Sequence, residues 1–549
     1  MLFRSNSNNN IIENISITTE TDYTINLTNS NNNKIINNYL NGNNFSGGNS
    51  TIIQTNSKNS TLFNNTPEII ILTNDNYNDY FINQVFVLNK TAEAVLGSNI
   101  YNKNMTFNHA ITLKNPRNYT IYNGTISLTH STGISNLTSL QFNVSDDRKT
   151  VINIIDVIGG RVNLFYSNII QYNKENQAQT IYVNKNSFLN ASYTNITLYA
   201  PEINSDDYNK LSTAVYCEKN TVISYGSITV NTTKTEPNGK IIGLYGGINS
   251  DLNMTINAKN NAIGVYTQSI SNSNITIHAE NNAIGVLYKN NNITYPRTQK
   301  ENNINLYSNN QTIGLLYTDI LLINYTYSNI PITIINHNIN LTSQNTIGIK
   351  LINTNITMTY NNINTNGTNN TPIYIENNKK SDILFNNFIS NVNAQNIFKN
   401  MGNITIKNNN MIIEKQKNLP LIIIENAENA QVISNFLKTE NLMGKYAVKT
   451  INVTNLTIEF NKPGTIITNE NYNQYFTNQI LNSDIDVIEL GSNFYNKNMI
   501  FNHKVLIENP NNYTIYNGTL IFTENATNSN ITGINIHNTD DRQTSLKVN

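Results

Sequence analysis

Two Asp-Asp-Arg triplets are the residues in this sequence best suited to chemistry. Paired carboxylates carry out general acid–base work in enzymes that cleave polysaccharides. Adjacent residues on a strand point to opposite faces, so one aspartate of each pair would lie exposed beside the arginine. In the sequence, no third carboxylate or His-Gly pair completes a site around either triplet. We therefore expect the triplets to be architectural, with Asp147 pairing with Arg148 or capping a turn, and we keep a catalytic role as the weaker alternative for Asp146, Asp147, Arg148, Asp540, Asp541 and Arg542.

Residue types that hold metals or cofactors show no pattern of ligands. None of the six histidines pair at ligand spacing, and the Gly-Gly-x-Gly-x-Asp repeat of calcium-binding β-rolls is absent from the sequence. Cys217 is the single cysteine, which excludes a disulfide framework. We predict no catalytic residues, no metal site and no cofactor.

The charge composition of the chain limits the classes of partner that it is expected to bind. The 549 residues include 35 basic and 35 acidic side chains, and this balance argues against nucleic acid or an anionic membrane as the main partner. No apolar stretch is long enough to span a membrane. Neither a signal peptide nor an anchor is recognisable, so we expect this chain to be a fragment of a larger protein or a degraded reading frame.

The elements that must position these residues repeat along the chain. Residues 253–266 (NMTINAKNNAIGVY) match residues 274–288 (NITIHAENNAIGVLY) at an offset of 21 residues. Relatives of this repeat occur at 303–317 and, shortened, at 339–349. Superposition of the repeats predicts one structural ladder, made of Ile263, Gly264, Ile284, Gly285, Ile313, Gly314, Ile347 and Gly348.

One repeat holds two apolar segments of strand length, joined by paired asparagines that tolerate left-handed backbone. A single repeat cannot bury its apolar face, but copies stacked roughly 4.8 Å apart line a continuous core. We therefore predict an all-β fold, a right-handed parallel β-helix with coils of about 21 residues and short capping helices. The asparagine pairs should lie above one another as amide ladders.

A longer module occurs twice. Residues 74–148 and 469–542 share the sequences GSN, YNKNM, FNH, NYTIYNGT and DDR, at a constant offset of 394 residues from Leu96 and Leu490 onward. Aromatic residues at helical spacing predict a short helix over 76–84 that covers the open end of the stack. We divide the chain into terminal coils (1–66), the first module (67–148), β-helix coils (149–462) and a truncated second module (463–549). Within the coils, 416–460 has the least regular spacing, and a non-β-helical insertion there is left open.

The two modules and the coils between them resemble the Asn/Thr-rich adhesin-like surface proteins of methanogenic archaea, whose repeats are of the pectin-lyase-like β-helix type. The motifs NYNxYF, GSNxYNKNMxFNH, NYTIYNGT and DDR carry this resemblance. It implies an extracellular or cell-surface location and an adhesive role.

Two functions therefore remain. The first is a non-enzymatic, adhesin-like or structural repeat protein whose corner loops and tyrosine-rich outer face contact glycans, other cell-surface polymers or cells. The alternative is a β-helix polysaccharide lyase or glycoside hydrolase, which would need an exposed cluster of carboxylates in a groove.

Overall fold

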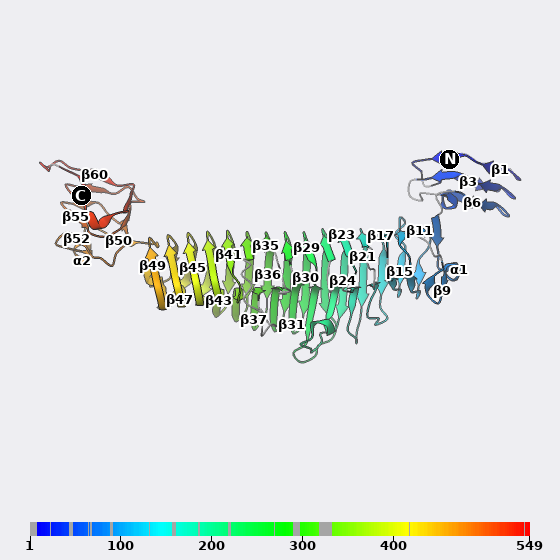
Figure 1. Cartoon of the computed structure of the whole chain (residues 1–549), viewed down its shortest axis with the longest axis horizontal. Helices are drawn as coiled ribbons and strands as arrows, with labels where there is room; N and C mark the ends of the chain where they lie inside the picture. The colour runs from blue at the N-terminus through cyan, green and yellow to red at the C-terminus, as the bar shows by residue number, and fades with distance from the viewer. Residues whose placement is uncertain are drawn as a thin grey trace. The chain divides into compact units, whose positions relative to one another are not determined.

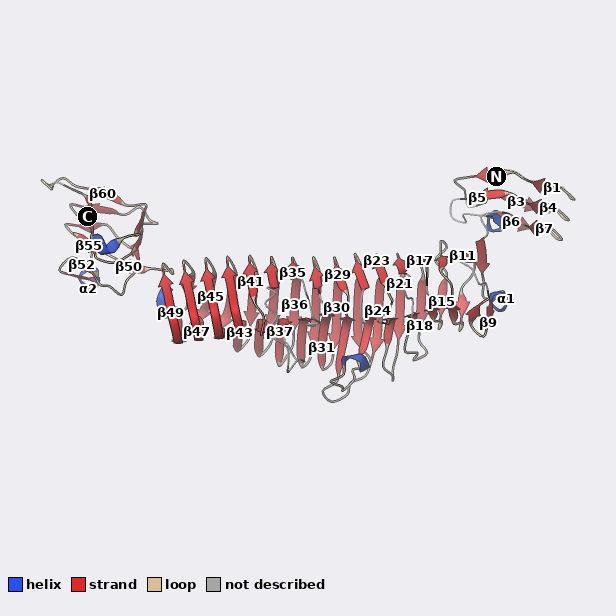
Figure 2. Cartoon of the chain, in the orientation of Figure 1, coloured by secondary structure: helices blue, strands red, loops and turns tan. Residues whose placement is uncertain are grey.

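The computed structural model describes residues 8–21, 23–42, 48–63, 65, 69–87, 92–130, 132–155, 161–184, 187–217, 221–267, 269–288, 297–317, 332–416, 418–542 and 544–549. The chain divides into two compact units, residues 1–287 (unit 1) and residues 288–549 (unit 2). Both units consist almost entirely of β-strands, and the predicted all-β class is confirmed (Figure 2). The predicted boundary at residues 66 and 67 lies outside the described residues.

Unit 1 begins with short parallel coils that have their own core. Strands at equivalent positions of successive coils pair in parallel, as β1–β4–β7, β2–β5 and β3–β6. Their bounds are β1 (Ile11–Glu13), β2 (Ser16–Thr18), β3 (Ile25–Thr28), β4 (Lys34–Ile36), β5 (Tyr39–Asn41), β6 (Ile52–Thr55) and β7 (Thr61–Phe63). The core contains Ile12, Ile25, Leu27, Ile35, Leu40 and Ile52.

The rest of unit 1 is a longer stack in which each strand pairs in parallel with the third strand after it, so that three strands make one coil (Figure 1). One sheet contains β12 (Ile100–Tyr101), β15 (Thr120–Tyr122), β18 (Gln141–Val144), β21 (Asn168–Tyr172), β24 (Asn195–Ala200), β27 (Ser227–Thr232), β30 (Asn253–Ala258) and β33 (Asn274–Ala279). A second row contains β8 (Ile69–Leu72), β11 (Ala92–Leu96), β14 (Ile111–Lys114), β17 (Ile134–Thr138), β20 (Arg161–Phe165), β23 (Leu189–Ser192), β26 (Thr221–Ser224), β29 (Ile248–Ser250) and β32 (Ser269–Ser271). The third row contains β10 (Val85–Phe86), β13 (Met105–Phe107), β16 (Ile126–Leu128), β19 (Ile152–Ile154), β22 (Gln179–Val183), β25 (Ser212–Cys217), β28 (Lys240–Tyr245), β31 (Asn261–Thr267) and β34 (Asn282–Tyr288).

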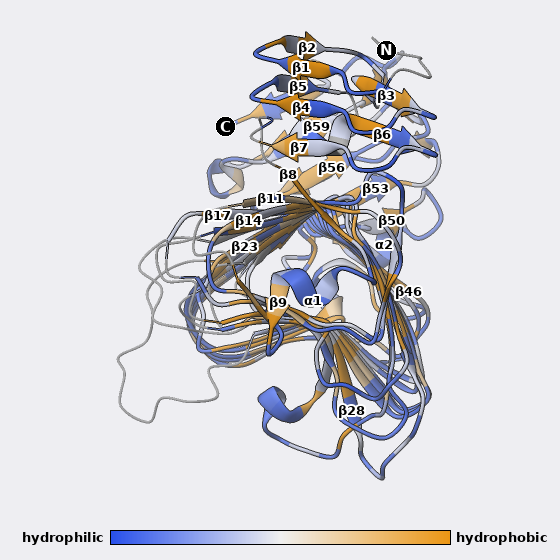
Figure 3. Cartoon of the chain, turned by 90° about the vertical axis from the view of Figure 1, so that its right-hand side faces the viewer, coloured by the Kyte–Doolittle hydropathy of each residue, from blue (hydrophilic) through white to orange (hydrophobic). Residues whose placement is uncertain are grey.

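Alternation along each strand places the core inside the coils. In β30, Met254, Ile256 and Ala258 are buried, while Asn253 and Asn257 are exposed. Figure 3 shows the same division, with hydrophobic residues along the strands and hydrophilic residues at the turns. Buried Ile, Val and Leu side chains of neighbouring coils therefore stabilise the stack by removing apolar surface from water.

Unit 2 continues this construction with longer strands. Its first coils use β35 (Arg297–Lys300), β36 (Asn303–Tyr307), β37 (Gln311–Tyr317), β38 (Ile332–Ile335), β39 (Asn338–Thr342), β40 (Asn345–Ile352), β41 (Ile356–Thr359) and β42 (Asn362–Asn366). From β43 (Asn369–Leu384) onward, one long strand replaces two of the three strands, since β43 pairs with both β40 and β41. The remaining strands of this stack are β44 (Asn387–Val392), β45 (Asn396–Lys407), β46 (Asn410–Lys415), β47 (Ile422–Ile433), β48 (Phe436–Lys438) and β49 (Val448–Glu459). The described residues 418–460 therefore belong largely to the regular stack, interrupted by a turn that includes the 3-10 element at Gly444–Ala447.

The coils are longer and less uniform than the predicted 21 residues. Paired side chains on successive coils are 21 residues apart at Asn261 and Asn282, but 32 apart at Asn195 and Ser227. In unit 2, Asn303 and Asn338 are 35 residues apart. The repeat that is clearest in the sequence is thus among the shortest coils. Longer coils are tolerated because extra residues at a corner leave the strand register unchanged and cost little free energy.

Asparagine ladders run along the stack, which confirms that prediction. Asn282 donates from its side chain to Asn261 Oδ1 at 2.6 Å. In unit 2 a second ladder is fully buried, and each of its first four members donates both its backbone N–H and its side-chain amide to the side-chain oxygen of the next asparagine. This buried ladder consists of Asn361, Asn386, Asn409, Asn435 and Asn461, with exposed fractions of 0–2%.

Both modules open with a short helix, and the first is shorter than the predicted range 76–84. Helix α1 covers only Tyr77–Tyr80, and the chain then enters β9 (Phe81–Ile82), which pairs antiparallel with β10. The helix ends because Phe81 adopts an extended backbone and stacks on Tyr77, with ring centroids 4.6 Å apart. The Phe81 ring also contacts Phe86 and Phe107, so the hairpin that follows the helix packs on the interior of the first coil.

The second module repeats this arrangement in unit 2. Helix α2 (Tyr472–Tyr475) is followed by Phe476, whose ring stacks on Tyr472 at 4.5 Å. Its strands are β50 (Thr465–Ile467), β51 (Phe476–Thr477), β52 (Ile480–Leu481), β53 (Val487–Leu490), β54 (Phe494–Tyr495), β55 (Met499–Phe501), β56 (Leu506–Glu508), β57 (Thr514–Tyr516), β58 (Leu520–Phe522), β59 (Asn530–Thr532), β60 (Asn535–His537) and β61 (Leu546–Val548).

Candidate functional site

The first Asp-Asp-Arg triplet holds three successive coils together through its arginine. Arg148 donates from Nε to Asp146 Oδ1 at 2.7 Å, and its Nη2 contacts Asp146 Oδ2. Nη1 donates to Asn104 Oδ1 and to Thr125 Oγ1, both at 2.8 Å, and Nη2 also donates to the carbonyl oxygen of Asn123. We call this arrangement the arginine clamp, since every nitrogen of the guanidinium group is engaged.

The roles within the triplet differ from those expected. Asp146, not Asp147, pairs with Arg148. Asp147 has a left-handed backbone (φ 55°), and its carboxylate accepts a hydrogen bond from the backbone N–H of Lys174 on the next coil. The strand rule fails here because the triplet follows the end of β18 at Val144, so the two aspartates do not alternate on a strand.

The second triplet forms the same clamp in unit 2. Arg542 donates from Nε to Asp540 at 2.6 Å, and from Nη1 to Asn498 at 3.1 Å and to Thr519 at 3.0 Å. Its Nη2 contacts Asp540 and the carbonyl of Asn517. Asp541 lies exposed beside this clamp. The matching contacts of the two copies show that each triplet links neighbouring coils.

The electrostatics of the clamp agree with a structural role. The hydrogen bond from Arg148 lowers the pKa of Asp146 below its ordinary value, and Arg542 does the same to the pKa of Asp540. A general acid needs the opposite shift to remain protonated near neutral pH. In this arrangement the two aspartates serve as ionised partners of arginine.

The predicted ladder of isoleucines and glycines falls on strands of both units. In unit 2, Ile313 pairs with Ile347, and a Cβ atom on Gly314 would lie 2.5 Å from the carbonyl oxygen of Gly348. A Cβ atom on Gly348 would lie 2.3 Å from the carbonyl oxygen of Pro372. The glycines are therefore required by a close approach of the backbone.

In unit 1, a Cβ atom on Gly264 would lie 2.5 Å from the carbonyl oxygen of Gly285. Ile263 is 5% exposed, whereas Ile284 is only half-buried, as is Ile347 in unit 2. The isoleucines of the repeat are thus unequal in burial, although their sequence context is nearly the same.

The most conspicuous surface feature of unit 1 is a row of stacked tyrosines. Tyr166, Tyr193 and Tyr225 lie on three successive coils, with ring centroids 5.1 and 5.2 Å apart and ring planes within 7° and 11° of parallel. Their exposed fractions are 60%, 49% and 56%. We call these three residues the tyrosine row.

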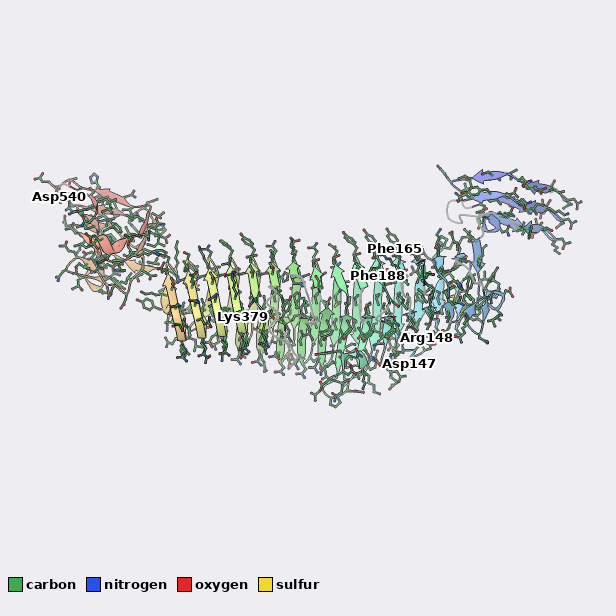
Figure 4. All side chains as sticks on the ribbon, in the orientation of Figure 1. Asp147, Arg148, Phe165, Phe188, Lys379 and Asp540 are labelled. Carbon is green, nitrogen blue, oxygen red and sulfur yellow. The ribbon has the colours of Figure 1, made fainter. Side chains whose placement is uncertain are left out.

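Polar and aromatic side chains flank the tyrosine row on both sides. On one side Phe165, Ser192 and Ser224 are register partners on β20, β23 and β26. On the other side Asn168, Asn195 and Ser227 are register partners on β21, β24 and β27. In Figure 4, Phe165 and Phe188 lie toward one edge of this stack, whereas Asp147 and Arg148 lie toward the other.

The sequence analysis anticipated a tyrosine-rich outer face but did not identify its members. The signal was present as Tyr-Ser-Asn, Tyr-Thr-Asn and Tyr-Gly-Ser, each at the corner before a strand of one sheet. It was missed because these coils are 27 and 32 residues long, so that a 21-residue period does not align the tyrosines.

Three further findings concern the described residues only. No group of three or more His, Cys, Asp or Glu side chains is arranged to hold a metal ion. No described helix has the length and apolar character needed to cross a membrane. Cys217, the single cysteine of the sequence, is buried on β25.

Comparisons with known proteins give no match, so the functional assignment rests on the structure. No family model and no curated protein matches this sequence, and no solved structure matches this fold.

Proposed function

We propose that this chain is a non-enzymatic, adhesin-like surface protein whose parallel coils form a right-handed β-helix and whose outer face binds carbohydrate or other cell-surface polymers. Right-handed coiling follows from the strong preference of parallel crossover connections. The surface location rests on the resemblance to archaeal adhesin-like proteins.

The exposed aromatic stacks carry this proposal. Besides the tyrosine row, Tyr101 stacks on Tyr122 in unit 1, with ring centroids 5.0 Å apart. In unit 2, Tyr360 stacks on Phe385 at 5.4 Å, and both rings are exposed. Large exposed apolar side chains that form contiguous groups typically mark a binding surface. Several such groups on one chain would give many weak contacts, which together bind a repetitive partner with useful strength.

The test is a screen of the purified full chain against glycan and cell-wall polymers, reading both retention of the polymer and release of shorter products. We expect binding without shortening of any polymer. A double variant, Asp146→Asn with Asp147→Asn, should bind as the wild type does, because these carboxylates hold neighbouring coils. As a matched control for removing acidic charge, Asp206→Asn changes a fully exposed carboxylate that pairs with Lys240.

Cleavage of a polymer by the wild-type chain, lost in the double variant but kept in Asp206→Asn, would replace this proposal with an enzyme. Circular dichroism of each variant verifies that the coils remain folded.

A further inference from the structure

The tyrosine row occupies a backbone position that disfavours tyrosine. From Asn118 to Ser434, the corner residue two positions before each strand of the sheet that contains β21 has a positive φ angle. In other coils this corner holds Asn272 (φ 49°), Asn336 (φ 56°) and Asn408 (φ 56°), and in unit 2 it also holds the aromatic pair Tyr360 (φ 58°) and Phe385 (φ 56°). Asparagine tolerates this left-handed region, whereas a bulky aromatic residue in it is an outlier.

Tyr166, Tyr193 and Tyr225 each have a φ of 52°. Three consecutive coils therefore accept an unfavourable residue at a position where asparagine is available to the fold. Burial does not explain the choice, since about half of each side chain remains exposed. Strained residues that the core does not require point to a function.

We propose that the tyrosine row binds a neutral, linear polysaccharide that runs along the stack of coils. This inference rests on the proposed function and names its contact residues and ligand class. The rings repeat at 5.1 and 5.2 Å, which is the separation of neighbouring strands and close to the length of one sugar unit in an extended glycan. A linear glycan can therefore make the same contact at each coil.

The chemistry of the row fits sugars. Each phenol hydroxyl both donates and accepts hydrogen bonds, and the ring carbons offer an apolar surface to sugar C–H groups. The flanking rows add the amides of Asn168 and Asn195 and the hydroxyls of Ser192 and Ser224, which lie 2.8 Å apart. Aromatic rings bordered by amides and hydroxyls present both kinds of contact that a neutral glycan needs.

Charge favours a neutral ligand over a polyanion. At the start of β20, the guanidinium carbon of Arg161 lies 4.8 Å from the centroid of the Phe188 ring. Binding of a nucleic acid rests on many phosphate contacts from a basic surface, and the whole chain is neutral. Single-stranded DNA, whose bases also stack on tyrosines, is therefore the competing ligand to test.

The experiment replaces all three tyrosines with asparagine, the residue that other coils use at this corner. Binding of a β-1,4-linked glucose hexamer, a xylan and a mannan is measured by titration calorimetry for the full chain. For the polymer that the wild type binds, we expect the triple variant to lose at least about tenfold in affinity. Its melting temperature should be unchanged or higher, because asparagine relieves the backbone strain. The matched control is Tyr446→Asn, which removes a single exposed tyrosine in unit 2 and should change neither property.

The outcomes separate this inference from the proposed function. A wild type that binds none of these glycans and no other polymer in the screen refutes the proposed function and this inference together. Equal binding by the wild type and the triple variant refutes only the role of the row. A clear fall in the melting temperature of the triple variant shows that the rings serve the fold, which also overturns the inference. Tighter binding of single-stranded DNA than of any glycan overturns the ligand class.

Discussion

His337 is a buried titratable residue within the polar ladder of unit 2. It lies one coil before Asn361, is 1% exposed, and donates its backbone N–H to Asn361 Oδ1 at 2.9 Å. Burial lowers the pKa of its imidazole from 6.5 to about 4, because the charged form is poorly solvated there. Between about pH 4 and 6.5, the imidazole of His337 is therefore neutral in the folded protein and protonated in the unfolded chain.

The consequence is a loss of stability in acid. As the pH falls from 6.5 to about 4, the unfolded state takes up a proton that the folded state refuses, so the free energy of unfolding falls. At about 1.4 kcal/mol per pKa unit, the loss amounts to about 3 kcal/mol. Urea unfolding at a series of pH values measures it. His337→Asn, which extends the asparagine ladder by one member, should remove most of this pH dependence. The same dependence in both proteins would contradict the assignment.

The buried asparagine ladder is the element that ties the coils of unit 2 together from inside. Asn409 Oδ1 accepts hydrogen bonds from the backbone N–H of Asn386 at 2.8 Å and from its side-chain amide at 3.0 Å. Its own amide donates to the carbonyl oxygen of Ile383 at 2.7 Å and to Asn435 Oδ1 at 3.0 Å. One side chain thus satisfies polar groups on three coils that have no access to water.

Asn409→Ala should therefore lower the free energy of unfolding by about 3 kcal/mol, because it leaves several buried donors and acceptors unsatisfied. The matched control is the next residue. Asn410 belongs to a half-buried ladder and donates to Asn387 Oδ1 at 2.7 Å, where water can replace the lost partner. Asn410→Ala should cost less than about 1 kcal/mol. Equal losses in denaturant unfolding would show that burial does not decide the strength of the ladder.

The secondary-structure elements also show how much of the fold can be predicted from the sequence. The strands of the regular coils were predictable because apolar alternation is local: the segments at 254–256 and 262–266 lie within β30 and β31. The coil lengths were not, because corner insertions leave no periodic trace. The length of helix α1 was overestimated from the spacing of its aromatic residues. Tyr77 and Phe81 do lie on one side of the chain, but Phe81 follows the end of the helix and its ring stacks on that of Tyr77. Which aspartate pairs with Arg148 could not be predicted, because Asp147 adopts a left-handed backbone that residues within a strand do not adopt.

Over the whole molecule, the residues that the two modules share make the same contacts in both copies. Tyr77 and Tyr472 each donate a hydroxyl to the backbone of the next coil, at Asn104 and Asn498. A lysine lies over each of these tyrosine rings, at 4.9 Å for Lys103 and 4.8 Å for Lys497. The shared residues of the duplication thus coincide with the opening helix and the arginine clamp. The tyrosine row lies outside the first module, so the proposed ligand surface belongs to the intervening coils.

The charge of the whole chain sets how salt should affect ligand binding. With 35 basic and 35 acidic residues, the chain has no net charge to attract a polyanion. A neutral glycan releases no counterions on binding, and hydrogen bonds and ring contacts at short range are little affected by screening. The affinity for the glycan that binds most tightly should therefore change less than about twofold between low and high salt. Titration calorimetry across a salt series measures this, with polygalacturonate as the charged control polymer. A linear fall of log affinity with log salt concentration for the neutral glycan is the result that would contradict binding through the tyrosine row, because such a slope requires charges at the contact.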